Sequence, residues 1–317
     1  MYRCPGQSQR AAILGGHHRG ESGLINDVQG RCLMVQGVAS GVGKSLLAAA
    51  LCRIMVQDGL RVAPFKAWNM ALNSYMTDDG QEIGWAQGIQ AEAAAILATG
   101  HMNPFLLKPS GGGRSQIIIR GEPQAGGYTK DINDLLPEGP WPVITQSLNY
   151  LQRRYDVIII EGAGSPAEIN LKDRDWANMG VARLAKAPVL LTADIDRGGA
   201  FAALIGTCEL LDALENEHIA GFVINKFRGD FDILRPGLTT IEEMTGKPVL
   251  GVIPYIEGLS LGEEDSLGMS EIDIAGELES STPQIREEHI NRLAEVVRAS
   301  LDIEQIYRLM DKGITSS

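Results

Sequence analysis

The stretch "GVASGVGKS", from Gly37 to Ser45, constrains the fold more than any other feature of the sequence. It follows a short apolar run at 32–37 and opens a longer apolar, helix-like run at 44–59. A glycine-rich loop between a strand and a helix directs backbone N–H groups and the positive helix end into one concavity, which holds phosphate oxygens. The sequence therefore predicts a phosphate loop, in which Lys44 bridges the β- and γ-phosphates of ATP and the Ser45 hydroxyl ligates Mg²⁺.

The spacing of this loop differs from the common form, because five residues rather than four separate Gly37 from Gly43. The early part of the loop is Val38-Ala39-Ser40, without the lysine that partitioning ATPases place there, and this disfavours that class. A chance glycine-lysine-serine turn is the alternative, and the flanking strand and helix argue against it. The nucleotide contacts predicted from the loop are Gly37, Ser40, Gly41, Val42, Gly43, Lys44 and Ser45.

Further strand-like runs alternate with helical stretches along the chain. We expect strands at 61–66, 116–121, 156–162, 187–194, 219–225 and 248–254, and helices at 83–98 and 143–155. Apolar strands without strict alternation, interleaved with helices, indicate a parallel sheet that is covered on both faces. The predicted fold is therefore an α/β, three-layer phosphate-loop NTPase of the dethiobiotin synthetase-like type.

The chain has 317 residues and a hydrophobic content of 44%, which suit one large domain with appendages. We interpret residues 1–30 as a polar N-terminal extension and residues 31–256 as the ATP-dependent domain. Residues 257–317 are expected to form an acidic linker and a C-terminal helical tail. In that tail, apolar residues at helical spacing over 285–310 predict one or two helices.

The formal net charge of −12 argues against nucleic acid or an anionic membrane as a partner. No apolar run reaches the roughly 18 residues that cross a bilayer, and the first residues lack the apolar core of a signal peptide. The spacing of the cysteines matches no zinc site, so buried free thiols and a cytoplasmic location are expected. These cysteines are Cys4, Cys32, Cys52 and Cys208.

Polar residues follow several of the predicted strands, at the sheet edge where α/β proteins bind ligands. Lys66 ends the strand at 61–66 and is a candidate to contact a transferred phosphoryl group or a substrate carboxylate, although a solvated surface lysine is the alternative. Asn69 and Asn73 follow as candidate substrate contacts. Glu161 directly follows the run "DVIII" and is predicted to bind Mg²⁺ or to order water.

The segment 161–180, "EGAGSPAEINLKDRDWANMG", continues the polar pattern behind this strand. Asp173 and Asp175 are candidate catalytic residues, and Asn170 and Asn178 are candidate substrate contacts. Asp175 alternatively only caps the helix that follows. Together these side chains exceed what capping requires, and they indicate a site for a polar substrate, a metal and a nucleophile.

Two later strand ends repeat the arrangement. Asp196 and Arg197 follow the strand at 187–194 as candidate substrate contacts. Asn225 ends the strand at 219–225, and its amide offers both a donor and an acceptor to the edge of an adenine. We assign Asn225 and the adjacent Lys226 to nucleotide binding. One shared site for nucleotide and substrate is the simplest interpretation.

At these residues the sequence resembles the synthetase domain of cobyric acid synthase, a glutamine-dependent amidotransferase family of cobalamin biosynthesis. The resemblance covers roughly residues 31–268. It rests on the segments "PFKAWNMALNS", "EIGWAQ", "MNPFLLKP", "EGAGSPAEINLKDRDWANMG", "ADIDRGGAF", "GFVINKFRGD" and "TGKPVLGVIPY". The phosphate loop alone would indicate only the wider group that includes dethiobiotin synthetase and cobyrinic acid a,c-diamide synthase.

The resemblance implies a chemistry for the site. In the family, a carboxylate of adenosylcobyrinic a,c-diamide attacks the γ-phosphate of ATP, and ammonia converts the acyl phosphate into an amide, at four carboxylates in all. The implied roles are charge stabilisation by Lys44 and Lys66, Mg²⁺ binding by Ser45 and Glu161, and positioning of substrate or ammonia by Asp173 and Asp175.

The chain also departs from the family pattern. No cysteine follows Cys208, so we expect this chain to lack the family's glutaminase domain, with ammonia from solution or a separate glutaminase subunit. The sequence is either a piece that ends near the domain boundary or a natural stand-alone synthetase, and the helical tail and N-terminal extension favour the second. Trp68 and Trp85 replace residues expected to be polar or basic, which would reshape the substrate pocket.

Two other functions remain open from the sequence. One is a dethiobiotin synthetase-like enzyme that acts on a smaller substrate, and this leaves the corrinoid-type segments unexplained. The other is a non-catalytic, nucleotide-dependent corrinoid-binding protein. Relatives with this fold commonly bury a helix face between subunits, so a homodimer is a further expectation.

Overall fold

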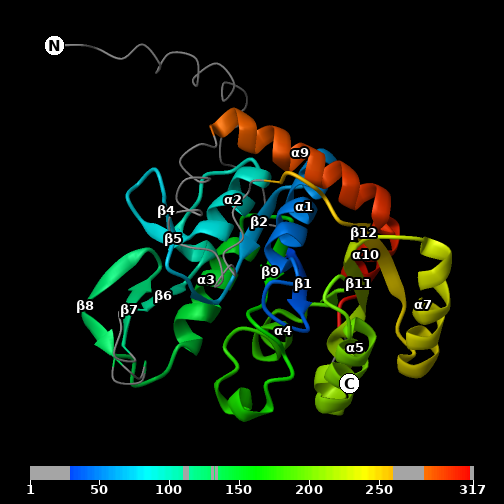
Figure 1. Cartoon of the computed structure of the whole chain (residues 1–317). Coiled ribbons are helices and arrows are strands. Elements are labelled where there is room, and N and C mark those ends of the chain that lie inside the picture. The colour runs from blue at the N-terminus through cyan, green and yellow to red at the C-terminus, as the bar shows by residue number, and fades with distance from the viewer. Residues whose placement is uncertain (1–28, 110–113, 130–131, 133–134, 260–281, 315–317) are drawn as a thin grey trace.

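The computed structural model describes residues 29–109, 114–129, 132, 135–259 and 282–314. Cys4, most of the expected N-terminal extension and residues 260–281 of the expected acidic linker lie outside these ranges. The order of strands and helices follows the predicted alternation (Figure 1). They are β1 (Arg31–Gly37), α1 (Lys44–Gln57), β2 (Val62–Phe65), β3 (Trp68–Met70), β4 (Ser74–Met76), β5 (Glu82–Gly84), α2 (Trp85–Ala93), η2 (Gly100–Met102), β6 (Phe105–Pro109), β7 (Ser115–Ile119), β8 (Glu122–Thr129), α3 (Trp141–Gln152), β9 (Val157–Glu161), η4 (Ile169–Arg174), α4 (Met179–Ala185), β10 (Val189–Asp194), α5 (Ala200–Leu210), α6 (Ala213–His218), β11 (Ile219–Phe227), α7 (Phe231–Thr245), β12 (Val249–Pro254), α9 (Pro283–Ser300) and α10 (Ile303–Lys312).

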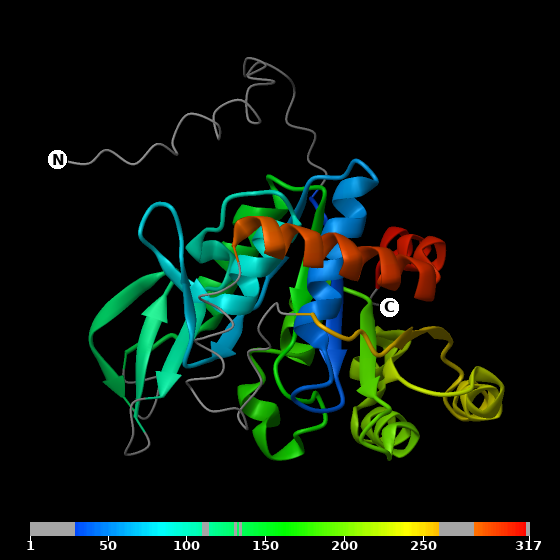
Figure 2. The same cartoon turned by 45° about the horizontal axis from the view of Figure 1, so that its top comes forward.

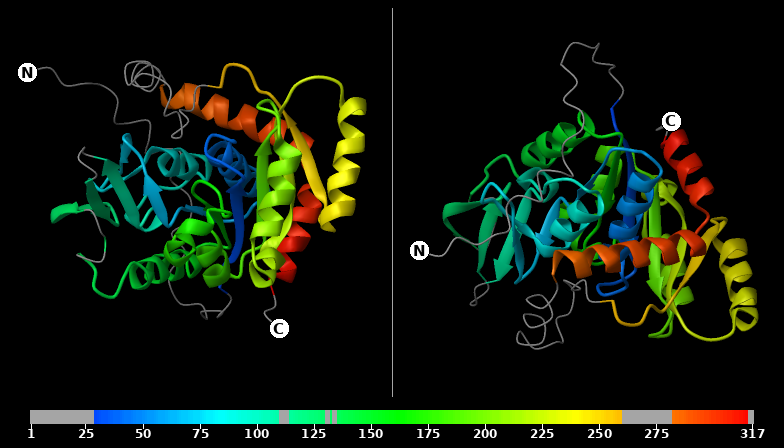
Figure 3. Two further views of the ribbon diagram at one scale, coloured as in Figure 1. Left: turned by 60° about the horizontal axis from the view of Figure 1, so that its bottom comes forward. Right: turned by 90° about the horizontal axis from the view of Figure 1, so that it is seen from above.

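The central sheet has six parallel strands in the order β12-β11-β10-β1-β9-β2. Helices α1, α2, α9 and α10 pack on one face, and α3, α4, α5 and α7 contribute to the core on the other. Figure 3 shows α1 and α9 on one side of the sheet and α3 and α4 on the opposite side. The predicted three-layer α/β architecture is therefore confirmed.

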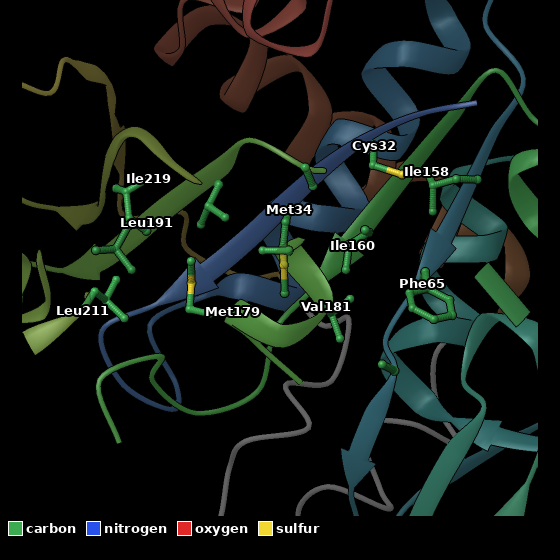
Figure 4. Packing of buried hydrophobic residues seen from close by; sticks show 14 of the residues in the cluster. Cys32, Met34, Phe65, Ile158, Ile160, Met179, Val181, Leu191, Leu211 and Ile219 are labelled. Atoms are coloured by element: carbon green, nitrogen blue, oxygen red, sulfur yellow. The ribbon is translucent and has the colours of Figure 1, made fainter. Parts of the chain in front are cut away.

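Each central strand supplies apolar side chains to both faces, because successive side chains of a strand point in opposite directions. In β1, Cys32 and Met34 join the core beneath α3 and α4, whereas Leu33 and Val35 join the core beneath α1. Figure 4 shows the first of these two cores, with Met34 close to Ile160 of β9. This two-sided burial explains why the strands read as continuous apolar runs rather than as alternating ones.

A second, four-stranded sheet has the order β3-β6-β7-β8, and it corrects one sequence-based expectation. The predicted strand at 116–121 corresponds to β7, which pairs antiparallel with β6 and β8 and so lies outside the parallel sheet. Only a few residues link β6 to β7, too few for the crossover that a parallel pair needs. Arg120 and Gly121, both at positive φ, form the two-residue turn into β8.

The C-terminal segment forms two helices, which is one of the two outcomes predicted from the sequence, namely one helix or two. Helix α9 ends at Ser300, and Asp302 caps α10 by accepting a hydrogen bond from the Gln305 amide at 2.8 Å. Both helices bury apolar residues in the core that α1 shares, and α9 crosses over α1 (Figure 2). The expected tail is thus packed onto the domain rather than extended from it.

The described cysteines are buried and unpaired, as the sequence predicted. Cys32, Cys52 and Cys208 are free thiols, and burial raises the pKa of Cys32 to about 12, although a hydrogen bond from Gln152 opposes that effect. No helix within the described ranges is long and apolar enough to span a membrane.

Candidate functional site

The side-chain alternation of the parallel strands gathers polar residues at one place. At the carboxyl ends of β2, β9 and β11, the last buried apolar residue faces α3 and α4, so the residue after it faces α1. Phe65, Ile160 and Ile224 lie in the core on the α3 and α4 side. Lys66 and Glu161 therefore emerge beside each other on the α1 face, because β2 and β9 are neighbours that pair Phe65 with Ile160. One physical rule, the two-residue period of a strand, builds this site.

The phosphate loop connects β1 to α1 and has the backbone shape that its glycines permit. Gly41 and Gly43 adopt φ values of +71° and +96°, a region that residues with a Cβ rarely occupy. A Cβ on Gly43 would lie 2.2 Å from the Asn225 Nδ2 atom, so only glycine fits there. Lys44 is 2% exposed, and its ammonium donates a hydrogen bond to the Ala39 carbonyl at 2.9 Å.

The end of β11 holds this loop in place. Asn225 Nδ2 donates to the Val42 carbonyl at 2.8 Å, and Lys226 Nζ donates to the Gly41 carbonyl at 2.8 Å. The side-chain oxygen Oδ1 of Asn225 accepts a hydrogen bond from the Lys226 backbone amide at 2.9 Å. Both residues predicted to bind nucleotide therefore contact the phosphate loop. The recognition of adenine by Asn225 stays a prediction, since its amide already supports the loop.

Asp196 and Arg197, predicted as substrate contacts, lie at the end of β10 beside the phosphate loop. The buried Asp194 carboxylate organises this corner, with Lys226 Nζ at 3.3 Å and Arg197 Nε at 3.5 Å. The Asp196 amide donates to Asp194 at 2.9 Å. Arg197 Nη2 would lie 3.3 Å from a Cβ built on Gly41, so this guanidinium stands over the loop. The geometry suits contact with phosphate more directly than contact with an acceptor carboxylate.

Glu161 is the centre of a buried polar cluster. Its Oε1 accepts hydrogen bonds from the Ser45 hydroxyl at 2.8 Å and from the Lys66 ammonium at 2.9 Å. Its Oε2 accepts from Gln87 Nε2 at 3.1 Å and from Gln90 Nε2 at 2.6 Å. Four donors match the capacity of an ionised carboxylate, whose two oxygens offer four lone-pair directions. The predicted alternative of a solvated Lys66 is excluded, since this residue is 4% exposed.

The two glutamines of this cluster were missed by the sequence reasoning. Gln87 and Gln90 lie one turn apart on α2, and both are fully buried. Their signal in the sequence was a pair of polar residues at i and i+3 in an otherwise alanine-rich helix, which places both on one face. Asn69 Nδ2 donates a hydrogen bond to the side-chain oxygen Oε1 of Gln87 at 3.1 Å. Asn69, which was predicted to contact substrate, therefore supports the Glu161 cluster through Gln87.

The oxygen atoms of Ser45 and Glu161, beside the N-terminus of α1, are suitable ligands for a magnesium ion. Mg²⁺ takes one or two protein oxygens together with water and substrate phosphates, and Ser45 and Glu161 supply two such oxygens beside Lys44. Across the described part of the chain, no group of three or more histidine, cysteine, aspartate or glutamate side chains is arranged to hold a metal. The residues therefore suit an ion shared with a nucleotide rather than one caged by protein alone.

The loop after β9 is fixed by hydrogen bonds between side chains and the backbone. Asn178 donates to the Ala163 carbonyl at 2.6 Å and accepts the Ala163 amide at 3.1 Å. Asp175 accepts the Asn178 amide at 2.7 Å and the Gly180 amide at 3.1 Å. Asp175 thus accepts backbone N–H groups at the start of α4, close to what the capping alternative expected, although the N-cap position itself is occupied by Asn178. Its role and that of Asn178 in the reaction stay predictions.

The remaining predicted residues are exposed. Asp173 and Asn170 lie on the short helix η4, and Asn73 lies between β3 and β4. The structure brings none of these three into the buried Glu161 cluster. Their assignment as catalytic or substrate-binding residues depends on what binds beside η4.

A cavity of about 360 Å³ lies beside the loop after β9, within the size range of small-molecule sites. Its walls combine aromatic, aliphatic and polar side chains. The lining includes Trp68, Met70, Ala163, Gly164, Ser165, Ile169, Leu171, Lys172, Arg174, Asp175, Asn178 and Leu210. The cavity lies beside the strand end that carries Glu161, so it is a candidate site for a small-molecule ligand.

Comparison with known proteins agrees with this geometry. Residues 33–267 match the family model described as the CobQ/CobB/MinD/ParA nucleotide binding domain. The chain belongs to this family. The match spans β1 to the segment beyond β12, so the whole parallel sheet and every strand end described above lie inside the CobQ/CobB/MinD/ParA domain.

Three similar curated proteins are named cobyric acid synthase or probable cobyric acid synthase. The chain is 56% identical over 251 residues to cobyric acid synthase from Pelotomaculum thermopropionicum, covering 78% of this chain and 48% of that protein. It is 58% identical over 237 residues to the Sorangium cellulosum enzyme, covering 75% and 45%. It is 49% identical over 283 residues to a probable cobyric acid synthase from Methanothermobacter thermautotrophicus, covering 89% and 56%.

The resemblance predicted from the sequence is therefore confirmed. The chain spans about half the length of the curated relatives it matches.

Proposed function

We propose that the chain is an ATP-dependent amidoligase that activates side-chain carboxylates of a cobyrinic acid a,c-diamide-type corrinoid for amidation in cobalamin biosynthesis. The observation that carries the proposal is the buried cluster in which Ser45 and Lys66 both contact Glu161 beside the phosphate loop. Such a cluster places a metal-binding carboxylate and a cation where a phosphoryl group is transferred. The names of the relatives supply the substrate class.

The first step joins the acceptor to phosphate. A carboxylate oxygen of the substrate attacks the γ-phosphorus of ATP, the bond from that phosphorus to the ADP oxygen breaks, and an acyl phosphate results. Lys44 exchanges its hydrogen bond with the Ala39 carbonyl for phosphate oxygens, and Lys66 neutralises charge on the transferred group. Mg²⁺, held by Ser45 and Glu161, would screen the charge of the β- and γ-phosphates when bound.

The second step forms the amide. Ammonia attacks the acyl carbon, the bond between that carbon and the phosphate oxygen breaks, and inorganic phosphate leaves while the nitrogen loses a proton. We assign Asp173 to the positioning of ammonia or substrate at the cavity, and Asp175 to the support of the loop through its hydrogen bonds to the backbone. The ammonia comes from solution or from a separate glutaminase.

The test is amide formation from ATP, ammonium chloride and a cobyrinic acid a,c-diamide, followed by mass spectrometry and by phosphate release. We expect product from the wild type and none above background from Lys44→Ala. Lys312→Ala is the matched control because Lys312 is exposed on α10, and it should keep wild-type turnover.

Two results would contradict the proposal. Turnover of diaminopelargonic acid with no turnover of the corrinoid would favour the dethiobiotin synthetase-like alternative. Nucleotide-dependent corrinoid binding without phosphate release, in folded protein supplied with ammonium, would favour the non-catalytic alternative.

A further inference from the structure

Several exposed apolar side chains gather around the cavity beside the loop after β9. Met70 is 60% exposed, Ile169 63%, Leu171 49% and Leu210 52%, and all four line this cavity. They come from β3, η4 and α5, which are distant in sequence. A gathered apolar rim of this kind on a water-facing surface is typical of a binding site. The rim therefore indicates a ligand with an extended apolar face.

One wall of the same cavity is aromatic. Trp68 lines the cavity, and its ring lies 5.2 Å from the Phe105 ring and 4.9 Å from the Trp176 ring, measured between centroids. Phe105 is fully buried, so it supports the indole from behind. A ring packed on two sides loses little further freedom when a ligand stacks on it. The two ring contacts therefore restrain the position of the Trp68 indole.

Another part of the cavity lining is connected to the domain by ion pairs. The Lys172 ammonium of η4 lies 2.9 Å from an Asp212 carboxylate oxygen and 3.0 Å from a Glu215 oxygen. Asp212 and Glu215 form the capping box of α6, which fixes their positions. These ion pairs tie η4, with its apolar rim residues, to a helix that packs on the domain. Both the aromatic part and the η4 part of the cavity lining thus have contacts that restrain them.

The aromatic wall lies close to the phosphoryl-transfer residues. Trp68 is two positions from Lys66, and Ala163, which also lines the cavity, is two positions from Glu161. Two residues of chain span at most about 7 Å. Lys66 and Glu161 are themselves buried and do not line the cavity, so a ligand against Trp68 lies beside the residues assigned to phosphoryl transfer, one two-residue step of chain away from them.

We propose that Trp68 is a specificity-determining residue: its indole receives the flat apolar face of the macrocyclic acceptor and selects it over small aliphatic acids. This inference rests on the proposed function and deepens it. A cavity of about 360 Å³ is small for a macrocycle, because sites for ordinary drug-sized ligands already reach several hundred Å³. The cavity accordingly takes one edge of the ring with its carboxylate, and the exposed apolar rim supports the remainder.

The experiment compares Trp68→Leu, Trp68→Phe and Trp85→Leu in the full chain, with cobyrinic acid a,c-diamide as the probe. Trp85 was also expected from the sequence to reshape the substrate pocket, but it begins α2, packs on Tyr75 with the ring centroids 5.8 Å apart and does not line the cavity, so it is the matched control. KM and kcat are measured with saturating ATP and ammonium chloride. The Kd of the probe is measured by calorimetry, and melting temperatures identify any variant that fails to fold.

Trp68→Leu should raise KM and Kd for the corrinoid by about tenfold, the size of a lost aromatic contact. Its kcat and its KM for ATP should stay within about twofold, because a wall that binds substrate and transition state equally changes only KM. Trp68→Phe keeps an aromatic face and should stay within about threefold of the wild type. Trp85→Leu should leave the corrinoid constants unchanged.

The outcomes separate this inference from the proposed function. If the wild type amidates the corrinoid and Trp68→Leu leaves KM and Kd unchanged, the role of Trp68 is refuted while the function stands. An equal effect of Trp85→Leu, or a loss confined to kcat, refutes that role as well. If the wild type neither binds nor converts the corrinoid, both proposals are refuted.

Discussion

Replacement of Glu161 by glutamine should destabilise the domain strongly, although the two side chains have nearly the same shape. The carboxylate accepts four hydrogen bonds in a site that is 1% exposed. An amide keeps one acceptor oxygen and replaces the other with an NH₂ group, which can only donate. Wherever that NH₂ group points, it faces two donors.

The hydrogen bonds set the size of the effect. If the new NH₂ group points toward Ser45 and Lys66, the Ser45 hydroxyl can rotate and accept a hydrogen bond from it. The Lys66 ammonium cannot accept one, because it carries no lone pair. On the other side, Gln90 could turn its amide, but it would then lose its hydrogen bond to the Ser45 carbonyl. Each buried donor left unpaired costs about 1–3 kcal/mol, and an uncompensated buried charge costs about 3–5 kcal/mol. We expect Glu161→Gln to lower the free energy of unfolding by about 3–5 kcal/mol.

The assay is thermal and urea unfolding of the purified chain without nucleotide. At about 2–4 °C per kcal/mol for a domain of this size class, the melting temperature should fall by roughly 6–20 °C. Glu243→Gln is the control, because Glu243 is exposed on α7 and a surface change of this kind shifts stability by less than about 0.5 kcal/mol.

The double variant Lys66→Met/Glu161→Gln tests whether the charge pair causes the loss. It should be less destabilised than the sum of the two single variants, because removal of the ammonium also removes the unpaired charge. A Glu161→Gln melting temperature equal to or above that of the wild type would refute this reasoning, and so would strict additivity.

Three further predictions concern other parts of the domain. Gly43→Ala should weaken ATP binding by at least about tenfold in calorimetry, because φ is +96° and the new Cβ would meet Asn225 Nδ2 at 2.2 Å; unchanged affinity would contradict the loop geometry. Cys32 and Cys52, whose pKa values burial raises, should react with a thiol reagent at pH 8 at least about a hundredfold more slowly in native than in denatured protein, and rapid native labelling would contradict their burial. Burial alone would raise the pKa of Glu82, but hydrogen bonds from Lys108 and Ser74 lower it below its ordinary value. The contribution of the Glu82 carboxylate to the free energy of unfolding should therefore be complete above about pH 4.3, the ordinary pKa of a glutamate, and should be lost as the pH falls through the lower folded pKa. The gap in melting temperature between wild type and Glu82→Gln should therefore narrow from about pH 6 to about pH 3, and a gap that widens would reverse the assigned sign.

Much of the nucleotide site was predictable, because local rules determine it. The glycines, Lys44 and Ser45 lie in one continuous loop between a strand and a helix, and such a loop forms one structure wherever it occurs. Glu161 was predictable because it follows a strand with no break. The role of Gln87 was not predictable, since a glutamine in a helix gives no sign of its partner until the helix is packed.

The sequence by itself determined the layers, the phosphate loop and the polar strand ends, because periodicity and chain neighbours carry that information. Only the tertiary structure decided that Lys66 meets Glu161, since that contact needs β2 and β9 to be neighbours in the sheet although 95 positions separate the two residues. The cavity beside the loop after β9 is likewise a product of packing: Trp68 on β3 and Leu210 on α5 form one surface only after distant segments have docked. Hydrophobic burial drives that docking, and it depends on the shape of the whole domain rather than on any one segment.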